Sequence, residues 1–138
     1  MRNEIADLEL YCKEIIAQSA GKLAWNWDDY IGAMLAVFKR EQVSEIFSIF
    51  DEYFSASWDC ESVKDAPAQI LQISDELGGI RDRQYLFTSQ PDANFMVYAA
   101  WWPWGDGETY SLRIAPVFKK VSDYDYNKLI EEFCEWFE

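Results

Sequence analysis

Carboxylates are the most abundant reactive side chains of this sequence, and two sets of them fall at helical spacing. Residues three, four or seven positions apart share one face of a helix. Like charges so close cost about 0.2–0.5 kcal/mol per pair, and carboxylates at a helix C-terminus also oppose the helix dipole. We interpret both sets as stripes that bind a basic partner, with an ordinary solvated face as the alternative. The first set is Glu41, Glu45 and Glu52, and the second is Glu131, Glu135 and Glu138.

The run of three tryptophans and a proline at positions 101–104 is the most unusual local feature. Adjacent residues of a strand point to opposite faces, so its first two tryptophans cannot enter the same core layer. Trp104 falls in a predicted hairpin loop beside Asp106 and Glu108. Tryptophan is a favoured interface anchor and nearby charges steer encounter, so we assign Trp102 and Trp104 to partner binding with those two acids. Packing under helices and shielding of the hairpin edge is the alternative.

Catalytic and metal-binding patterns are weak by comparison. Histidine, the commonest general base and transition-metal ligand, is absent. The acidic loop 105–108 lacks the alternating ligands and the distal glutamate of a calcium-binding loop. Asp28 and Asp29 follow two tryptophans and suggest acid–base chemistry or sugar binding, but they fit better as cap and dipole partners of a helix. We therefore assign no catalytic residue, no cofactor and no metal.

Three cysteines are too few and too scattered for a disulfide framework, and their odd number fits a reducing compartment. Cys12 and Cys134 lie on or beside apolar stripes and are expected to be buried. Cys60 stands between Asp59 and Glu61, whose carboxylates should raise the pKa of its thiol and make it a poor nucleophile. Without an apolar signal segment or a run long enough to cross a bilayer, the expected location is the cytoplasm.

Composition sets the class of partner. The chain has 138 residues, of which 50% are hydrophobic and 17% aromatic, enough for a substantial core. Its 25 acidic and 12 basic residues give a net charge of −13. This field repels nucleic acids and anionic membranes and attracts basic proteins. No broad basic patch or glycine-rich phosphate loop argues otherwise.

The elements that must position these residues follow from periodicity. Apolar residues at helical spacing predict helices over about 4–20, from about 28, over 42–55, over 65–77 and over 123–137, the second and third being either separate or one kinked helix. Asn3, Asp65 and Ser122 are plausible N-caps, Gly21 a plausible stop, and residues 56–61 a loop. Aromatic and β-branched runs at 84–89, 94–102 and 109–117 predict strands of an antiparallel meander. The expected fold is α+β in one domain, residues 1–138: about four N-terminal helices, a three-stranded meander and a C-terminal helix.

These features together favour a binding protein over an enzyme. In broad composition the chain resembles immunity proteins, which are small, acidic, cytoplasmic and without catalytic motifs; no motif carries this resemblance. It implies an inhibitor that blocks a basic bacterial toxin such as a nuclease, because phosphate-binding active sites are basic. The alternative is a small acidic secretion chaperone or adaptor that binds an extended effector segment at a sheet edge, usually as a dimer. A monomer and a dimer both remain open. An enzyme that uses only carboxylates or tyrosines is a third possibility.

Overall fold

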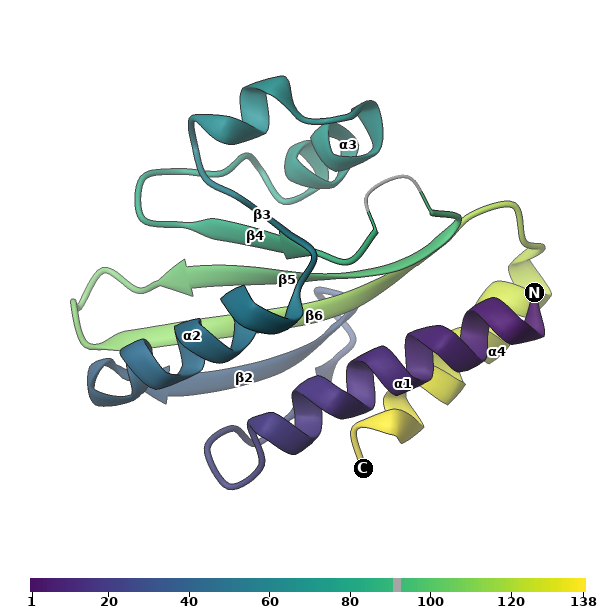
Figure 1. Ribbon diagram of the computed structural model, residues 1–138, viewed down its shortest axis with the longest axis horizontal. Helices are drawn as coiled ribbons and strands as arrows, with labels where there is room; N and C mark the ends of the chain where they lie inside the picture. The colour runs from purple at the N-terminus through teal and green to yellow at the C-terminus, as the bar shows by residue number, and fades with distance from the viewer. Residues whose placement is uncertain (91–92) are drawn as a thin grey trace.

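One six-stranded sheet organises the protein (Figure 1), in a computed structural model that describes residues 1–90 and 93–138. Four helices accompany it: α1 (Arg2–Gln18), α2 (Val43–Tyr53), α3 (Ala68–Glu76) and α4 (Asp123–Trp136). Short 3₁₀ turns precede α2 and α3, at Arg40–Gln42 and Ser62–Asp65. The strands are β1 (Asn26–Asp28), β2 (Ala33–Lys39), β3 (Ala56–Trp58), β4 (Tyr85–Thr88), β5 (Phe95–Pro103) and β6 (Thr109–Phe118).

The strands lie in the order β1-β2-β6-β5-β4-β3, and every neighbouring pair is antiparallel. The meander β4-β5-β6 is confirmed at the centre. It is extended on one side by β3 and on the other by the hairpin β1-β2, so the strand that comes second in the chain pairs with the sixth. Both edge strands have three residues, which limits the exposed backbone of the edges.

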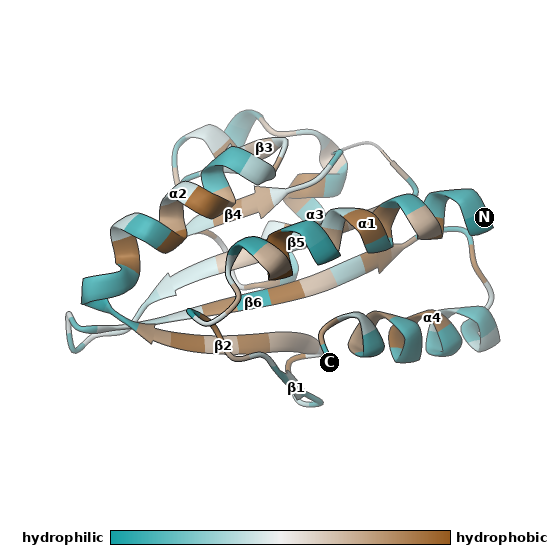
Figure 2. Ribbon diagram, turned by 60° about the horizontal axis from the view of Figure 1, so that its bottom comes forward, coloured by the Kyte–Doolittle hydropathy of each residue, from teal (hydrophilic) through white to brown (hydrophobic). Residues whose placement is uncertain are grey.

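Each face of the sheet has its own core. On one face, apolar residues of α1, α2 and α4 pack on β2, β4, β5 and β6, with Phe50, Phe87 and Phe133 fully buried. On the other face, α3 and the turn before it pack on β3, β4 and β5 around Ile70, Leu86 and Met96. The helices alternate hydrophilic and hydrophobic residues along their lengths, as elements covered on one side must (Figure 2).

The expected fold, with a sheet of only the three meander strands and about four N-terminal helices, is wrong because the sheet has six strands. The segment expected to be helical from Asp28 is instead the hairpin β1-β2, and the expected loop 56–61 contains β3. Of the expected N-terminal helices, three are present.

Residues 31–38 are predicted as a helix because their apolar positions fit the period of a helix as well as that of a strand. Ile31, Met34, Leu35 and Phe38 fit a helical stripe. In the structure Met34, Ala36 and Phe38 face the helices, whereas Leu35 and Val37 lie on the opposite face. The pairing of residues 34–39 with β6 outweighs the helix propensity of alanine, methionine and leucine.

Helix boundaries differ from expectation mainly at the caps. The first helix begins at Arg2, so Asn3 lies inside it, and Gly21 with φ of 79° lies in the turn that follows. Asp65 ends the 3₁₀ turn before α3 and does not cap that helix. Ser122 is confirmed as a cap, because its hydroxyl accepts a hydrogen bond of 3.1 Å from the N–H of Asp125. Among the described residues, no helix has the length and hydropathy needed to cross a membrane.

Candidate protein-binding site

The outer surface of α1, α2 and α4 carries most of the unpaired negative charge, and we call it the acidic layer. Helix α1 lies between α2 and α4 on one side of the sheet (Figure 1). Ten carboxylates have no cation within 4.0 Å in the described chain: nine belong to these helices and the turn before α2, and one to Glu138, two residues after α4. They are Asp7, Glu14, Glu41, Asp51, Glu52, Asp123, Asp125, Glu131, Glu135 and Glu138.

Five of the six stripe glutamates predicted to bind a partner are in this unpaired set. The exception is Glu45, whose carboxylate lies 3.3 Å from the Lys22 ammonium. Glu41 lies in the 3₁₀ turn before α2, so the first stripe spans two elements. Lys128, which stands three and four residues before acids of α4, lies over the Tyr124 ring at 5.1 Å instead of pairing with them.

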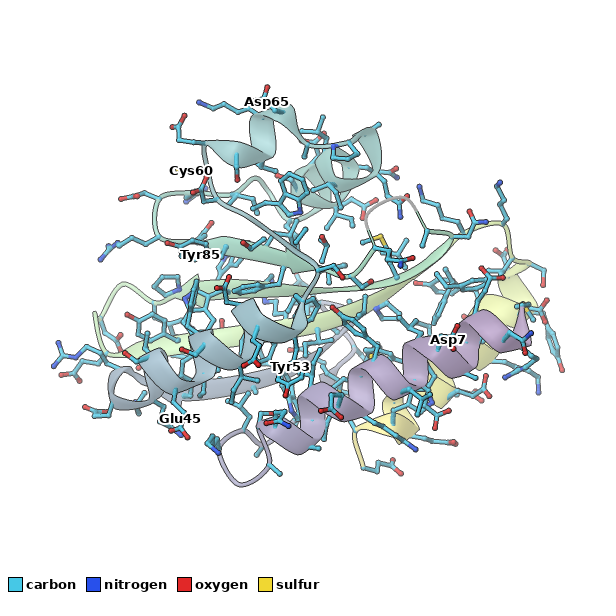
Figure 3. The ribbon with its side chains drawn as sticks, viewed as in Figure 1. Asp7, Glu45, Tyr53, Cys60, Asp65 and Tyr85 are labelled. Carbon is cyan, nitrogen blue, oxygen red and sulfur yellow. The ribbon has the colours of Figure 1, made fainter. Side chains whose placement is uncertain are left out.

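Acids of α1 and α2 converge on Tyr53 at the junction of these helices. The Tyr11 hydroxyl donates a 2.7 Å hydrogen bond to the Tyr53 carbonyl and ties the helices together. Desolvation raises the pKa of the Tyr53 phenol, and the charges of Glu52 and Glu14 raise it further. In Figure 3, Tyr53 lies at the end of α2 that faces α1, whereas Asp65 lies beside α3 on the other side of the molecule. The first stripe therefore continues onto α1.

A second convergence lies at the C-terminal end of α4. Burial raises the pKa of the Cys134 thiol, and the charges of Glu138 and then Asp29 raise it further, so both carboxylates lie near this thiol. Asp29 also accepts a 2.6 Å hydrogen bond from the Trp27 indole. The loop after β1 thus adds negative charge to the second stripe. Helix α1 separates this stripe from the stripe of α2.

The tryptophan run divides between the two faces of the sheet. Trp101 is 2% exposed and packs against Phe38 and Phe47 in the helix-side core. Trp102 is half-buried on the α3 side. Trp104 is 50% exposed, and its N–H donates to the carbonyl of Thr109, which extends the ladder beyond β5. By strand alternation Trp104 follows Trp102 on the α3 side, so neither belongs to the acidic layer.

Asp106 and Glu108 form the tip of the β5-β6 hairpin, and Asp106 has a structural role there. Its carboxylate accepts hydrogen bonds of 2.9 Å from the N–H groups of Glu108 and Thr109, and of 2.7 Å from the Thr109 hydroxyl. The bond from the N–H of Glu108 makes the largest contribution to lowering the pKa of Asp106. The N–H of Arg40 donates to the carbonyl of Glu108, so the tip lies beside the turn that carries Glu41.

Asp28, considered above for acid–base chemistry, closes a turn. Its carboxylate accepts hydrogen bonds from the N–H groups of Tyr30 and Ile31, at 2.9 and 3.2 Å, within the β1-β2 connection. The expected role as a helix cap is wrong because no helix follows. A short carboxylate side chain that binds the backbone two and three residues ahead is typical of a turn as well as of a cap.

Two surface hollows lie on the helix side of the sheet. One, of about 280 Å³, lies between α1, Ser55 and the start of β5 and is lined in part by Glu4, Asp7 and Tyr11. The other, of about 300 Å³, has an aromatic lining that includes Phe47, Tyr85, Trp101 and Tyr110, with Arg83 at its side. Among the described residues, no three acidic or cysteine side chains are grouped closely enough to hold a metal ion.

Sequence reasoning missed the contribution of α1 to the acidic layer. Asp7 and Glu14 are seven residues apart, the same signal that identified the other stripes, but they stand among lysine, arginine and apolar residues. Only the structure shows that Lys13 pairs with Glu9 and Arg2 with Glu132, which leaves Asp7 and Glu14 without a cation.

Comparisons of the chain with protein-family models, with curated proteins and with solved structures found no match. The proposal below rests on the unpaired carboxylates of the acidic layer.

Proposed function

We propose that this protein binds a basic protein partner through the acidic layer and inhibits it, as an immunity or antitoxin-type protein does when it neutralises a bacterial toxin such as a nuclease. The observation that carries the proposal is the set of ten carboxylates, on three adjacent helices and the residues next to them, that have no cation within 4.0 Å in the described chain. In the same elements only Arg40 and Lys128 make no ion pair within the described chain.

This charge distribution costs stability and therefore calls for a reason. Carboxylates four residues apart repel one another, and α4 ends with acids where cations are favoured. A surface whose charges all have one sign steers a partner of opposite charge toward it. Such steering raises the association rate on the order of 10–10³-fold. Occupation of a basic, phosphate-binding active site by this layer would block it. Inhibition follows from occupation and needs no catalytic group.

The test begins with capture of partners on the immobilised protein from cells of its source, eluted with rising salt. A basic protein released by salt is identified, purified and used for kinetics with charge-reversed variants. We choose Glu14→Lys with Glu52→Lys, since both side chains are exposed, unpaired and close to Tyr53. The association rate should fall about tenfold or more at low salt, and the difference should shrink at high salt.

The matched control is Asp75→Lys with Glu76→Lys on α3. These exposed acids lie on the opposite side of the sheet and give the same change in net charge. If both double variants slow association equally, net charge and not the acidic layer is responsible. If the purified partner keeps its own activity when saturated, the protein is an adaptor and not an inhibitor.

A further inference from the structure

The α3-side face of the sheet is only half covered. The core beneath α3 draws its strand residues from β3, β4 and β5 and, in β6, from Val117 alone. On the part formed by β2, the N-terminal half of β6 and the end of β5, the large side chains are exposed or half-buried, whereas the small Ser111 between Val37 and Trp102 is buried. We call this part the open face. It comprises Leu35, Val37, Trp102, Trp104, Ser111 and Arg113.

Apolar groups dominate the open face. Val37 and Trp104 are 47% and 50% exposed, among the most exposed large apolar side chains in the described chain. Leu35 and Trp102 are half-buried. In Figure 2, β2 is hydrophobic along most of its length, although it lies near the edge of the sheet. Exposed tryptophan beside an aliphatic residue and an arginine is the composition of an interface anchor.

Arg113 stands at the centre of this face and lacks an acceptor. It lies on a central strand, between Leu35 of β2 and Ala100 of β5. Its Nε is buried and has no hydrogen-bond partner, and no carboxylate of the described chain lies within 4.0 Å of its guanidinium. A buried donor without an acceptor costs stability. The chain has 25 acidic residues, yet none of those described in the structure forms an ion pair with this cation.

Other charged groups around the open face do not supply the missing acceptor. Lys39, at the end of β2, donates to the Thr109 hydroxyl at 3.2 Å, and Thr109 in turn donates to Asp106. Asp28, at the β1 end, already accepts two backbone hydrogen bonds. Tyr98 lies close enough to Arg113 for the guanidinium charge to oppose the rise that burial causes in its pKa.

We propose that the open face is a second interface, which binds a segment of a protein partner carrying an aspartate or glutamate between apolar residues. The carboxylate would pair with the guanidinium of Arg113, and the flanking side chains would pack on Val37, Trp102 and Trp104. The net charge of −13 repels a polyanion such as nucleic acid. A single carboxylate is repelled much less, because salt screens its interaction with the protein's exposed acids beyond about 8 Å.

The experiment uses three seven-residue peptides, blocked at both ends and identical except for glutamate, glutamine or lysine between two leucines. Each is titrated into the full-length, ¹⁵N-labelled protein while the arginine Nε–H and tryptophan indole signals are followed by NMR. The glutamate peptide should shift the signals of Arg113, Trp102 and Trp104. It should bind about tenfold or more tightly than the other two, because only its carboxylate can form a charged hydrogen bond with Arg113.

Two variants separate pairing from packing. Arg113→Gln should remove the preference for glutamate, whereas Arg81→Gln, at an exposed site outside the open face, should keep it. Val37→Glu, at a position that tolerates a polar side chain, should reverse the preference toward the lysine peptide. Equal binding of the glutamate and glutamine peptides, or shifts confined to the acidic layer, would overturn the proposal. Displacement of the peptide by inorganic phosphate at equal concentration would do the same, since it would show a general anion site.

Discussion

A carboxylate introduced into β2 tests the strand geometry on which the open face depends. Ala36 is 1% exposed and lies opposite the fully buried Leu112, whereas the next residue, Val37, is 47% exposed. We therefore compare Ala36→Asp with Val37→Asp. If residues 31–38 formed a helix with an apolar stripe, both positions would lie outside that stripe and both changes would be mild.

The structure predicts a large difference between these variants. A carboxyl group at position 36 would enter the core without a cation, and burial would raise its pKa above 7 and hold it neutral. Protonating a carboxyl group whose pKa in the unfolded chain is ~3.9 costs about 4 kcal/mol at pH 7, a large part of the ~5–15 kcal/mol that stabilises an ordinary domain. At position 37 the carboxylate stays hydrated, so the free energy of unfolding should fall by only about 1 kcal/mol.

Urea unfolding followed by tryptophan fluorescence measures both effects. With a slope of about 2 kcal/mol per M, the midpoint of Ala36→Asp should fall by about 2 M and that of Val37→Asp by about 0.5 M. The deficit at position 36 should shrink to about 1.4 kcal/mol at pH 5, because the unfolded chain then approaches its own carboxyl pKa. Ala36→Asn, which cannot ionise, should show no such pH dependence. Equal midpoints for the two aspartate variants would refute the strand register and with it the open face.

Three further predictions concern other parts of the molecule. Phe87→Ala, which empties a fully buried site between Phe47, Phe50 and Trp101, should lower the free energy of unfolding by about 3–5 kcal/mol in the same urea assay. Hydrogen bonds hold the pKa of Asp106 below its value in the unfolded chain. This carboxylate therefore stabilises the fold above its unfolded pKa, and the stabilisation is lost as pH falls through its folded pKa. The urea midpoint of Asp106→Asn should approach that of the wild type in acid, and a difference that widened in acid would contradict this prediction. In the native protein a thiol reagent at pH 8 should modify the half-buried Cys60 before Cys12, because burial raises the pKa of the Cys12 thiol. Cys60→Ser should remove the fast phase of the reaction with the reagent. Modification of Cys12 without unfolding would contradict the burial of this side chain.

Much of the fold follows from local patterns. The helices α1, α2, α3 and α4 each carry one apolar stripe at helical spacing, and the strands β4, β5 and β6 are runs rich in aromatic and β-branched residues, with turn residues between them. These elements were therefore predictable to within a few residues, and so was the capping hydroxyl of Ser122, because a cap acts within one turn. The excess of carboxylates and the lack of histidine also belong to the sequence alone.

Pairing between distant segments decided the rest. Residues 33–39 become a strand because β6 offers a full-length edge to pair with, and residues 56–58 do so beside β4. Which acids stay unpaired depends on which cations the fold brings within reach. Lys22 reaches Glu45 and Arg2 reaches Glu132, whereas Glu14 and Glu52 have no cation of the described chain within 4.0 Å and both lie near Tyr53. An isolated arginine facing an uncovered half of the sheet is likewise invisible in the sequence. Periodicity reports which side of an element is apolar, but a contact between elements is a property of three-dimensional packing alone.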